Sequence, residues 1–316
     1  MSPSAGRPAR RGNLTDRIEY VALRAVMGAA GLLPRSLMGR AGELTGDFVY
    51  RILRVRRRVV LENLGATLGQ TLDRAGVERI ARDVYRHLGR TLFEYGRFGD
   101  LRGDRLPAWL EVHGFEHLEE AYGRGRGVVV VTGHFGNWEL LGAIIAQHGL
   151  PVHFLAKEQR NPYVDRYMDR ARGRHLGVGV LNPGPELRRI FRCLRQGELI
   201  GMLFDQDAGS DGIFLDVLGR VASVQPGAAV FSYRTGAPIL PCGVFRLPGG
   251  RHRASFEPAF DPDPSAPHDE EIRRLTELCE ASLERCICLK PEQYYWVHRR
   301  WKTRPPAERQ FSREFS

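Results

Sequence analysis

The chain has 316 residues, 42% of them hydrophobic, so it is long enough to bury a large core in one sizeable domain or two small ones. Its 36 glycines and 19 prolines follow no period, which excludes a repeat or collagen-like architecture, and its formal net charge is +10. The five cysteines contain no C-x-x-C pair, so we interpret them as reduced thiols of a cytoplasmic protein and predict no metal site.

The positive charge is concentrated at the start of the chain. Residues 1–58 contain 12 arginines and 4 acidic residues, an excess of eight positive charges. A cationic block of this kind predicts an anionic partner, either nucleic acid or the surface of a membrane. Residues 1–13 are small and basic and include proline and glycine, so we expect a disordered basic tail there.

Apolar residues follow a helical period in residues 16–33. They recur on one stripe as Ile18, Val21, Ala22, Ala25, Val26, Ala29, Leu32 and Leu33. A helix that spans a bilayer needs ~20 apolar residues, but only ten uncharged residues separate Arg24 from Arg35. No clear small-residue cleavage site follows, so a signal peptide fits poorly. We therefore predict a helix in the membrane interface, with arginines near lipid phosphates; an amphipathic helix packed on the domain is the alternative.

Helices and strands then alternate along the chain. Helical patterns cover 35–53, 57–68 and 75–98, so residues 14–100 form a helical N-terminal region. Strands are expected at 110–113, 128–131, 152–156, 178–181, 199–204, 239–245 and 253–256, and a short apolar segment at 214–218. Helices are expected at 116–122, 140–145 with an end near Gly149, 163–175, 186–195, 227–235 and 269–288. This order predicts an α/β fold with a largely parallel central sheet flanked by helices. Residues 101–306 would form the core, in one domain with the preceding helices, and 307–316 a tail.

His134 lies where the buried strand 128–131 meets the next helix, the place where α/β sheets usually bind ligands. On a continuous helix Glu139 would lie about 140° away from it. A helix that begins near Gly136 or Asn137 would instead let Glu139 reach the imidazole from its first turn. We therefore predict His134 as a general base that Glu139 orients. The alternative is a loop histidine followed by an acid that the helix dipole favours.

Asp205 and Asp207 follow a second buried strand, with Arg160 as a candidate neighbour. These carboxylates could bind Mg²⁺ or form a solvated acidic turn, but the chain lacks the G-x-x-x-x-G-K-[ST] phosphate loop that usually accompanies the metal. It also lacks a G-x-S-x-G nucleophile elbow and an H-E-x-x-H metal motif. What remains is a base without a protein nucleophile, which suits direct attack by a substrate hydroxyl on an activated acyl group, without a cofactor.

Residues 128–139, V-V-V-V-T-G-H-F-G-N-W-E, resemble the H-x4-D/E block of glycerolipid and lysophospholipid acyltransferases. They are most similar to the branch that places secondary acyl chains on lipid A. Three further blocks agree with that branch: F-D-Q-D at 204–207, T-G-A-P-I-L-P at 235–241 and the closing P-E-Q-Y segment at 291–305. The resemblance covers residues 15–306. V-L-G at 217–219 replaces the usual F-F-G, and S-V-Q-P at 223–226 replaces a threonine-rich turn, which leaves chain length and acceptor open.

The resemblance implies an acyltransferase of lipid A (lipopolysaccharide) biosynthesis at the cytoplasmic face of the inner membrane. The donor would be an acyl-carrier-protein thioester, and the acceptor a hydroxyl of a lipid A precursor, usually that of a 3-hydroxyacyl chain. His134 would be the base and Glu139 its partner, without a covalent intermediate, and a helix N-terminus with nearby backbone N–H groups would stabilise the oxyanion.

The resemblance also implies substrate-binding residues. Arg160, Asp205 and Asp207 match positions near the family's site, and the block with His298, Arg299 and Arg300 would hold a phosphorylated acceptor or form a structural C-terminal clamp. Two other readings stay open. One is an acyltransferase for another glycolipid, such as a mannosylated phosphoinositide, or for a lysophospholipid. The other is a non-catalytic protein that binds a membrane or nucleic acid through its basic N-terminus.

Overall fold

The computed structural model describes residues 12–97 and 110–305. Most of the predicted tail 1–13 and all of the tail 307–316 lie outside these residues. Asn13 is described, and its side chain accepts a hydrogen bond from the backbone N–H of Asp16 at 2.8 Å, so it caps the first helix. All five cysteines are free thiols.

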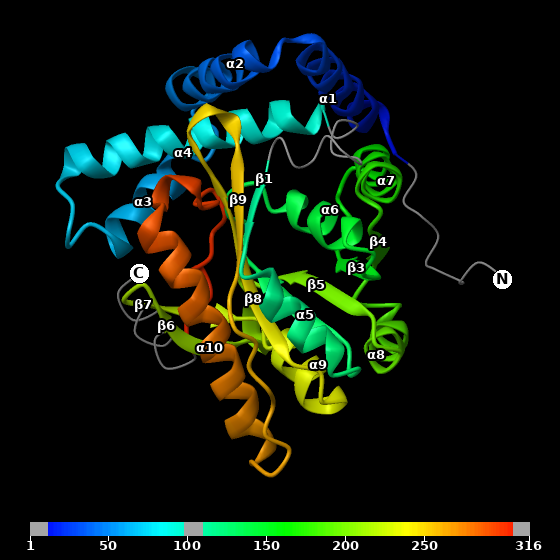
Figure 1. The fold of residues 1–316 in the computed structure, drawn as a ribbon. Coiled ribbons are helices and arrows are strands. Elements are labelled where there is room, and N and C mark those ends of the chain that lie inside the picture. Colours follow the sequence, from blue (N-terminus) through cyan, green and yellow to red (C-terminus); the bar gives the residue numbers. More distant parts are fainter. Residues whose placement is uncertain (1–11, 98–109, 306–316) are drawn as a thin grey trace.

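A seven-stranded sheet in the order β1-β9-β8-β2-β5-β3-β4 runs through the middle of the molecule (Figure 1). Its strands are β1 (Leu110–His113), β2 (Val128–Thr132), β3 (Val152–Leu155), β4 (Gly179–Leu181), β5 (Leu199–Leu203), β8 (Ile239–Arg246) and β9 (His252–Phe256). Neighbouring strands are parallel except for β8 and β9. The predicted α/β fold with a largely parallel sheet is confirmed.

Helices cover both faces of the sheet, and the valines of β2 are buried between the two layers. Val128 and Val130 pack into the core on the side of α5 (Phe115–Gly123), α6 (Glu139–Gln147) and α7 (Pro162–Ala171). Val129 and Val131 pack into the core on the other side. That side includes α3 (Arg57–Thr67), α4 (Arg74–Tyr95) and three later helices: α8 (Leu187–Arg195), α9 (Gly227–Thr235) and α10 (His268–Leu289). Successive side chains of a strand point to opposite faces, so a strand buried on both sides is apolar throughout.

The short apolar segment expected at 214–218 is one strand of a separate antiparallel ribbon. Its strands are β6 (Ile213–Val217) and β7 (Arg220–Val224). Leu218 and Gly219 connect them with φ values of 55° and 76°, a left-handed turn that matches the twist of a hairpin. The hairpin was missed because leucine is an unusual residue in the first position of such a turn.

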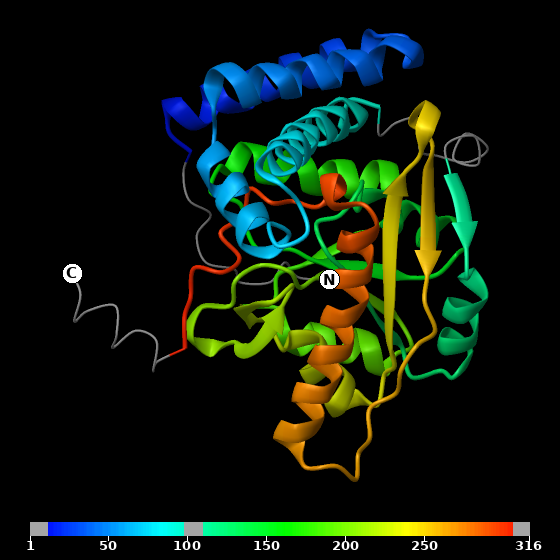
Figure 2. The ribbon, with the colours of Figure 1, turned by 90° about the vertical axis from the view of Figure 1, so that its left-hand side faces the viewer.

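The N-terminal region is helical, as predicted. It consists of α1 (Leu14–Leu32), α2 (Arg35–Phe48), the π-helical turn η1 (Val49–Leu53), α3 (Arg57–Thr67) and α4 (Arg74–Tyr95). Figures 1 and 2 show α1 and α2 as the outermost layer, over α4. Within the described residues, no helix combines the length and apolar character needed to cross a membrane.

The apolar stripe predicted on α1 faces away from the protein. Ile18, Val21 and Leu32 are 61%, 63% and 86% exposed, whereas Met27 and Ala30 on the other side are buried. On α2 and η1, the exposed apolar side chains continue with Leu37, Leu44, Phe48 and Ile52. The helix does pack on the domain, against α4 and α7, as in the alternative, but through its other side, and the predicted apolar stripe is left exposed.

Candidate active site

His134 and Asp205 meet because they follow neighbouring parallel strands. Thr132 at the end of β2 lies opposite Leu203 at the end of β5, so the residues that follow both strands emerge at the same edge of the sheet. The Nδ1 atom of His134 lies 2.7 Å from Oδ1 of Asp205, and the backbone N–H of His134 donates to Oδ2 at 2.9 Å. The carboxylate therefore fixes both the ring and the backbone of His134 and leaves Nε2 as the nitrogen that can take a proton.

The electrostatics of this pair suit a base. Burial alone would lower the pKa of His134, but the charge and hydrogen bond of Asp205, with the charge of Glu139, outweigh it and raise that pKa above its ordinary value. Burial acts against ionisation of Asp205 too, yet the His134 contacts and the Arg300 charge lower the Asp205 pKa to about 2. Asp205 is therefore ionised at neutral pH and can stabilise an imidazolium.

The prediction that Glu139 orients His134 is wrong in its geometry. Glu139 is buried at the start of α6, where its two carboxylate oxygens accept hydrogen bonds from Nη2 and Nε of Arg172 at 2.6 and 3.0 Å. Arg172 belongs to the π-helical turn η4 (Arg172–Leu176) that continues α7 and packs on α6. Its guanidinium engages the carboxylate, and Asp205 takes the place beside the imidazole. Glu139 still acts on His134 through its charge.

A buried polar network holds the loop between His134 and α6. His87 of α4 lies with Nε2 3.1 Å from the carbonyl oxygen of Gly136, and burial first, then the charge of Arg246, lowers the pKa of His87 to about 3. The amide of Asn137 donates to Glu94 at 2.8 Å, and Arg246 of β8 forms an ion pair with the same carboxylate. These contacts give Gly136 and Asn137 of the motif a structural role.

Gly136 is required by a close approach of two backbone segments. Its φ of +58° is in the left-handed region, and a Cβ there would overlap the carbonyl oxygen of Val244. Its N–H donates to the carbonyl oxygen of Gln293 at 3.0 Å, while the Gln293 side chain binds both backbone groups of Arg246 at 2.7 and 3.0 Å. The closing segment of the chain therefore supports the loop that carries His134.

His134 lines a cavity of about 680 Å³, and its partner Asp205 lies buried behind it. Its walls come from α1, α4, α6, α7 and the closing segment, and they include Leu23, Met27, Leu88, Leu92, Trp138 and Tyr295. The His134 ring lies 5.0 Å from the Trp138 ring and 5.6 Å from the Tyr295 ring. The cavity is thus largely apolar, with a base on its wall, and can receive an aliphatic chain beside a reacting polar group.

A second, narrow cavity continues from the first between α6 and the strands β3 and β5. The two share several lining residues, among them Trp138, Leu155 and Met202, and Phe154 is one of the residues that line the narrow part, which is about 30 Å³. A Cβ on Gly201 or on Gly142 would meet the Phe154 ring at 2.7 Å, so the ring already fills the space above both glycines.

The remaining predicted site residues do not line this cavity. Arg160 is exposed on the segment before α7, next to Gln159, which does line it. Asp207 accepts hydrogen bonds from the backbone and hydroxyl of Thr303 at 3.2 and 3.0 Å and lies 3.4 Å from Nζ of Lys302. Asp207 thus holds the closing segment in place rather than reaching the dyad.

Two of the three residues of the His-Arg-Arg block are part of a clamp. The Nε2 of His298 accepts a hydrogen bond from the backbone N–H of Asp207 at 3.2 Å. Arg300 is buried, with its guanidinium 2.5 Å from Glu280 and 2.7 Å from the hydroxyl of Tyr294. Arg299 is exposed. The arrangement favours the structural alternative for His298 and Arg300 over direct contact with an acceptor.

Arg172 and Tyr295 are site residues that the sequence did not single out. In the sequence, Arg172 is one of several arginines of the helix expected at 163–175, and Tyr295 lies within the closing block. A signal for Arg172 did exist, because a buried carboxylate such as Glu139 needs a cationic partner and α7 is the nearest basic helix along the chain.

Comparisons with known proteins agree with this geometry. A family model described as bacterial lipid A biosynthesis acyltransferase matches residues 14–303. The lipid A biosynthesis lauroyltransferase of Escherichia coli (strain K12) is 26% identical over 277 residues, which cover 86% of this chain and 88% of that protein. The lipid A biosynthesis palmitoleoyltransferase of the same strain is 29% identical over 281 residues, or 87% and 88% of the two chains. A phosphatidylinositol mannoside acyltransferase of Mycobacterium tuberculosis (strain H37Rv) is 25% identical over 158 residues, about half of each chain.

Proposed function

The chain belongs to the bacterial lipid A biosynthesis acyltransferase family and is an acyltransferase, and on this premise we propose that it transfers a fatty acyl chain from an acyl-carrier-protein thioester to a hydroxyl of a lipid A precursor. The observation that carries the proposal is the His134–Asp205 pair on the wall of a largely apolar cavity. A lone base beside space for a chain suits transfer to a substrate hydroxyl.

In the proposed reaction, Nε2 of His134 takes the proton of the acceptor hydroxyl as its oxygen attacks the thioester carbonyl. Asp205 keeps the proton on Nδ1 and stabilises the imidazolium that forms. The tetrahedral oxyanion then collapses, the carbon–sulfur bond breaks, and the imidazolium returns the proton to the leaving thiolate. The products are an ester and a free thiol, and no covalent enzyme intermediate forms. That the oxyanion is stabilised by backbone N–H groups at the start of α6 stays a prediction.

The shape of the cavity supports an aliphatic substrate. The wide part next to His134 has room for the reacting carbonyl and hydroxyl, and the narrow part has Trp138 and Phe154 in its wall. We assign the narrow part to the end of the acyl chain, because burial of methylene groups favours a close-fitting apolar channel.

We place the enzyme on the cytoplasmic face of the inner membrane, lying on the bilayer. Exposed apolar side chains on α1 and α2 support this location, together with the arginines of the same segments. Leu23 and Met27 on the inner side of α1 line the cavity. A helix that touches lipid on one side and the cavity on the other would give a lipid acceptor a short path to His134.

A second acceptor is also supported by the comparisons. Phosphatidylinositol mannoside acyltransferases are also relatives, so a mannosylated phosphoinositide is a second candidate acceptor. We favour the lipid A precursor because the two Escherichia coli relatives match 86% and 87% of this chain, whereas the phosphatidylinositol mannoside acyltransferases of Mycobacterium tuberculosis and Mycolicibacterium smegmatis match 48% and 68%.

The proposal is tested by acyl transfer from labelled thioesters to the candidate acceptors. We expect wild-type protein to acylate the lipid A precursor, with a higher kcat/KM for acyl-carrier-protein than for coenzyme A thioesters. His134→Ala should abolish turnover, and His113→Ala, a change of an exposed histidine on β1, should leave it within ~2-fold. Near-normal turnover of His134→Ala would remove the base from the mechanism. If only the mannosylated phosphoinositide is acylated, that lipid and not the lipid A precursor is the acceptor.

A further inference from the structure

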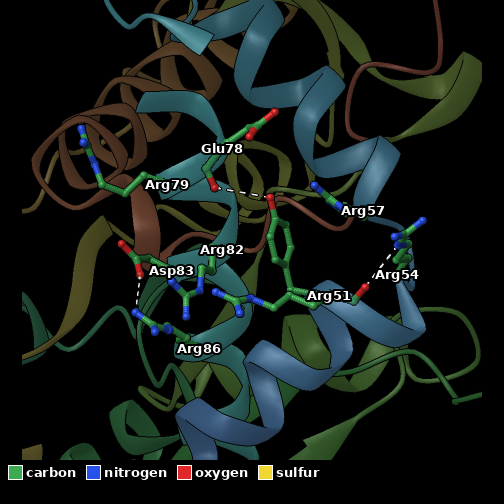
Figure 3. A pocket seen from close by; sticks show the side chains of 9 residues that line it. Arg51, Arg54, Arg57, Glu78, Arg79, Arg82, Asp83 and Arg86 are labelled. Carbon is green, nitrogen blue, oxygen red and sulfur yellow. Dashed lines mark hydrogen bonds and ion pairs between the residues drawn. The ribbon is translucent and has the colours of Figure 1, made fainter. Parts of the chain in front are cut away.

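A separate cavity, of about 650 Å³, lies between the η1–α3 segment and α4 and is lined by six arginines. We call it the arginine pocket; its arginines are Arg51, Arg54, Arg57, Arg79, Arg82 and Arg86. Figure 3 shows that they come from both sides, with Arg51 extending from η1 toward Arg82 of α4. None of these residues lines the cavity of His134, so the proposed acyl transfer leaves the arginine pocket without a role.

The charge of the arginine pocket is only partly neutralised by the protein. The guanidinium groups of Arg82 and Arg86 both donate hydrogen bonds to the Asp47 carboxylate, at 2.6 to 3.0 Å. These contacts, above all the one with Arg82, hold the pKa of Asp47 well below its usual range. Asp83 and Glu78 line the pocket too, which makes three acidic side chains for six arginines. Among the described residues, no ion pair involves Arg51, Arg54, Arg57 or Arg79, and six arginines against three carboxylates leave the pocket a net charge of +3 for a ligand.

Arg57 has a buried donor that lacks a partner. Its guanidinium lies 4.4 Å from the centre of the Tyr50 ring, a cation–π contact that holds it at the pocket wall. Its Nε is buried and, within the part of the chain that the structure describes, has no hydrogen-bond partner. Buried donors are nearly always satisfied, and this one leaves the Arg57 guanidinium at the pocket wall without an acceptor from the described residues.

The backbone that carries these arginines is held in an unusual conformation. Arg54 and Arg56 have φ values of 52° and 54°, in the left-handed region that favours glycine. The turn is fixed from behind, because the Tyr85 hydroxyl donates to the carbonyl oxygen of Val55 at 2.5 Å and Arg56 donates to that of Val297 at 3.1 Å. Such conformations persist where the surrounding structure enforces them, and they are concentrated at binding sites.

The arginine pocket borders the apolar surface of the N-terminal helices. Phe48, Ile52, Leu53 and Val55 are all more than half exposed, and they lie on the same segment as Arg51 and Arg54. Side chains of this kind enter the interface of a bilayer, which brings neighbouring arginines to the depth of lipid phosphates.

We propose that the arginine pocket binds a phosphate group carried by a lipid at the membrane surface, an inference that rests on the proposed membrane association of α1 and α2. Guanidinium groups bind phosphate oxygens in bidentate fashion, and a net charge of +3 in one concave site matches a phosphate better than a carboxylate. The phosphate could belong to an anionic phospholipid or to the glycolipid acceptor. An acidic carrier protein is the competing partner, but the exposed apolar side chains at the rim favour lipid.

The test compares two triple variants that remove the same charge. The pocket variant is Arg51→Gln/Arg54→Gln/Arg79→Gln, which leaves the structural contacts of Arg57, Arg82 and Arg86 intact. The control is Arg188→Gln/Arg192→Gln/Arg195→Gln, three exposed arginines of α8, far from α3 in the fold (Figure 1). One arm measures partitioning of the full chain onto phosphatidylglycerol-containing and onto pure phosphatidylcholine vesicles. The other uses neutral detergent micelles and measures KM for the phosphorylated acceptor, for the same acceptor without its phosphates, and for the acyl-carrier-protein donor.

If the bound phosphate belongs to a bulk phospholipid, the pocket variant should partition onto anionic vesicles on the order of 10²-fold more weakly than the wild type, and its KM in micelles should be unchanged. If the phosphate belongs to the acceptor, the pocket variant should have a KM for the phosphorylated acceptor ~10-fold or more above that of the wild type. With the dephosphorylated acceptor, the two proteins should have the same KM. Either result supports the site and names its source, provided that the control changes by less than ~2-fold. Wild-type behaviour in both arms, or a raised KM for the acyl-carrier protein alone, overturns the proposal. Vesicle binding needs no turnover, so failure of the proposed reaction is seen separately.

Discussion

Asp205→Asn is the substitution that tests the dyad most directly, because it keeps the shape of the side chain and changes its hydrogen bonding. Asp205 accepts two hydrogen bonds from His134, one from the backbone N–H at 2.9 Å and one from Nδ1 at 2.7 Å. An asparagine has only one oxygen. The backbone N–H is always a donor and claims that oxygen, so the amide NH₂ faces Nδ1. Nδ1 then becomes the acceptor, the proton moves to Nε2, and the imidazole can no longer act as a base.

The magnitude follows from what is lost. The variant loses a charge-assisted hydrogen bond and the countercharge of the imidazolium in a buried site, together about 3 to 5 kcal/mol. This corresponds to a fall of ~10² to 10⁴ in kcat/KM. Glu139 and the apolar walls remain, so the fold and the binding of the acyl chain should persist.

The pH profile gives an independent readout. The base must be neutral, so activity falls as the pH drops below the His134 pKa, which Asp205 helps to raise above its ordinary value. In Asp205→Asn the largest remaining influence is burial, which lowers that pKa, so the acidic limb of kcat/KM should move to lower pH. Acyl transfer at a series of pH values measures both effects, with circular dichroism as the control for folding. A loss of less than ~3-fold with an unmoved limb would refute the role of Asp205.

Three further substitutions test the surroundings of the dyad. Glu139→Gln leaves the Arg172 guanidinium buried without its carboxylate, so urea denaturation should show a free energy of unfolding lower by ~3 to 5 kcal/mol; unchanged stability would contradict the buried ion pair. Phe154→Ala lengthens the narrow cavity, and each additional buried methylene should favour a longer donor by ~0.8 kcal/mol, or about fourfold, in competition between thioesters; an unchanged preference would place the chain elsewhere. Arg300→Met leaves the Glu280 carboxylate buried without its partner and should lower the free energy of unfolding by a similar ~3 to 5 kcal/mol. The double variant Glu280→Leu/Arg300→Met removes both charges and should fold, with a wild-type KM for the acceptor. A raised KM of the folded double variant would return Arg300 to substrate binding.

Much of the local structure could be predicted because it depends on local patterns. The helix expected at 227–235 is α9 without a change of bounds, and that expected at 269–288 is α10 with one more residue at each end. Both follow from apolar periodicity within one segment. The position of His134 after a buried strand was predicted for the same reason. The hairpin of β6 and β7 was not, because its turn at Leu218 lacks the usual residues.

The partner of His134 could not be predicted from sequence distance. Glu139 is five positions away and Asp205 seventy-one, yet Asp205 makes the hydrogen bond. Two strand ends with ionisable residues were evident, but their meeting requires β2 and β5 to be neighbours in the sheet, and strand order is a property of the whole fold.

The sequence by itself determined the α/β fold, the helical N-terminal region, the family, and the histidine that serves as the candidate base, since each is written in a period or a contiguous motif. The tertiary structure alone decided which carboxylate orients that base, that Arg300 is part of a clamp, and that six arginines form one pocket. The physical reason is the same in each case. A hydrogen bond or ion pair acts over about 3 Å, and only packing of distant segments brings two side chains to that distance.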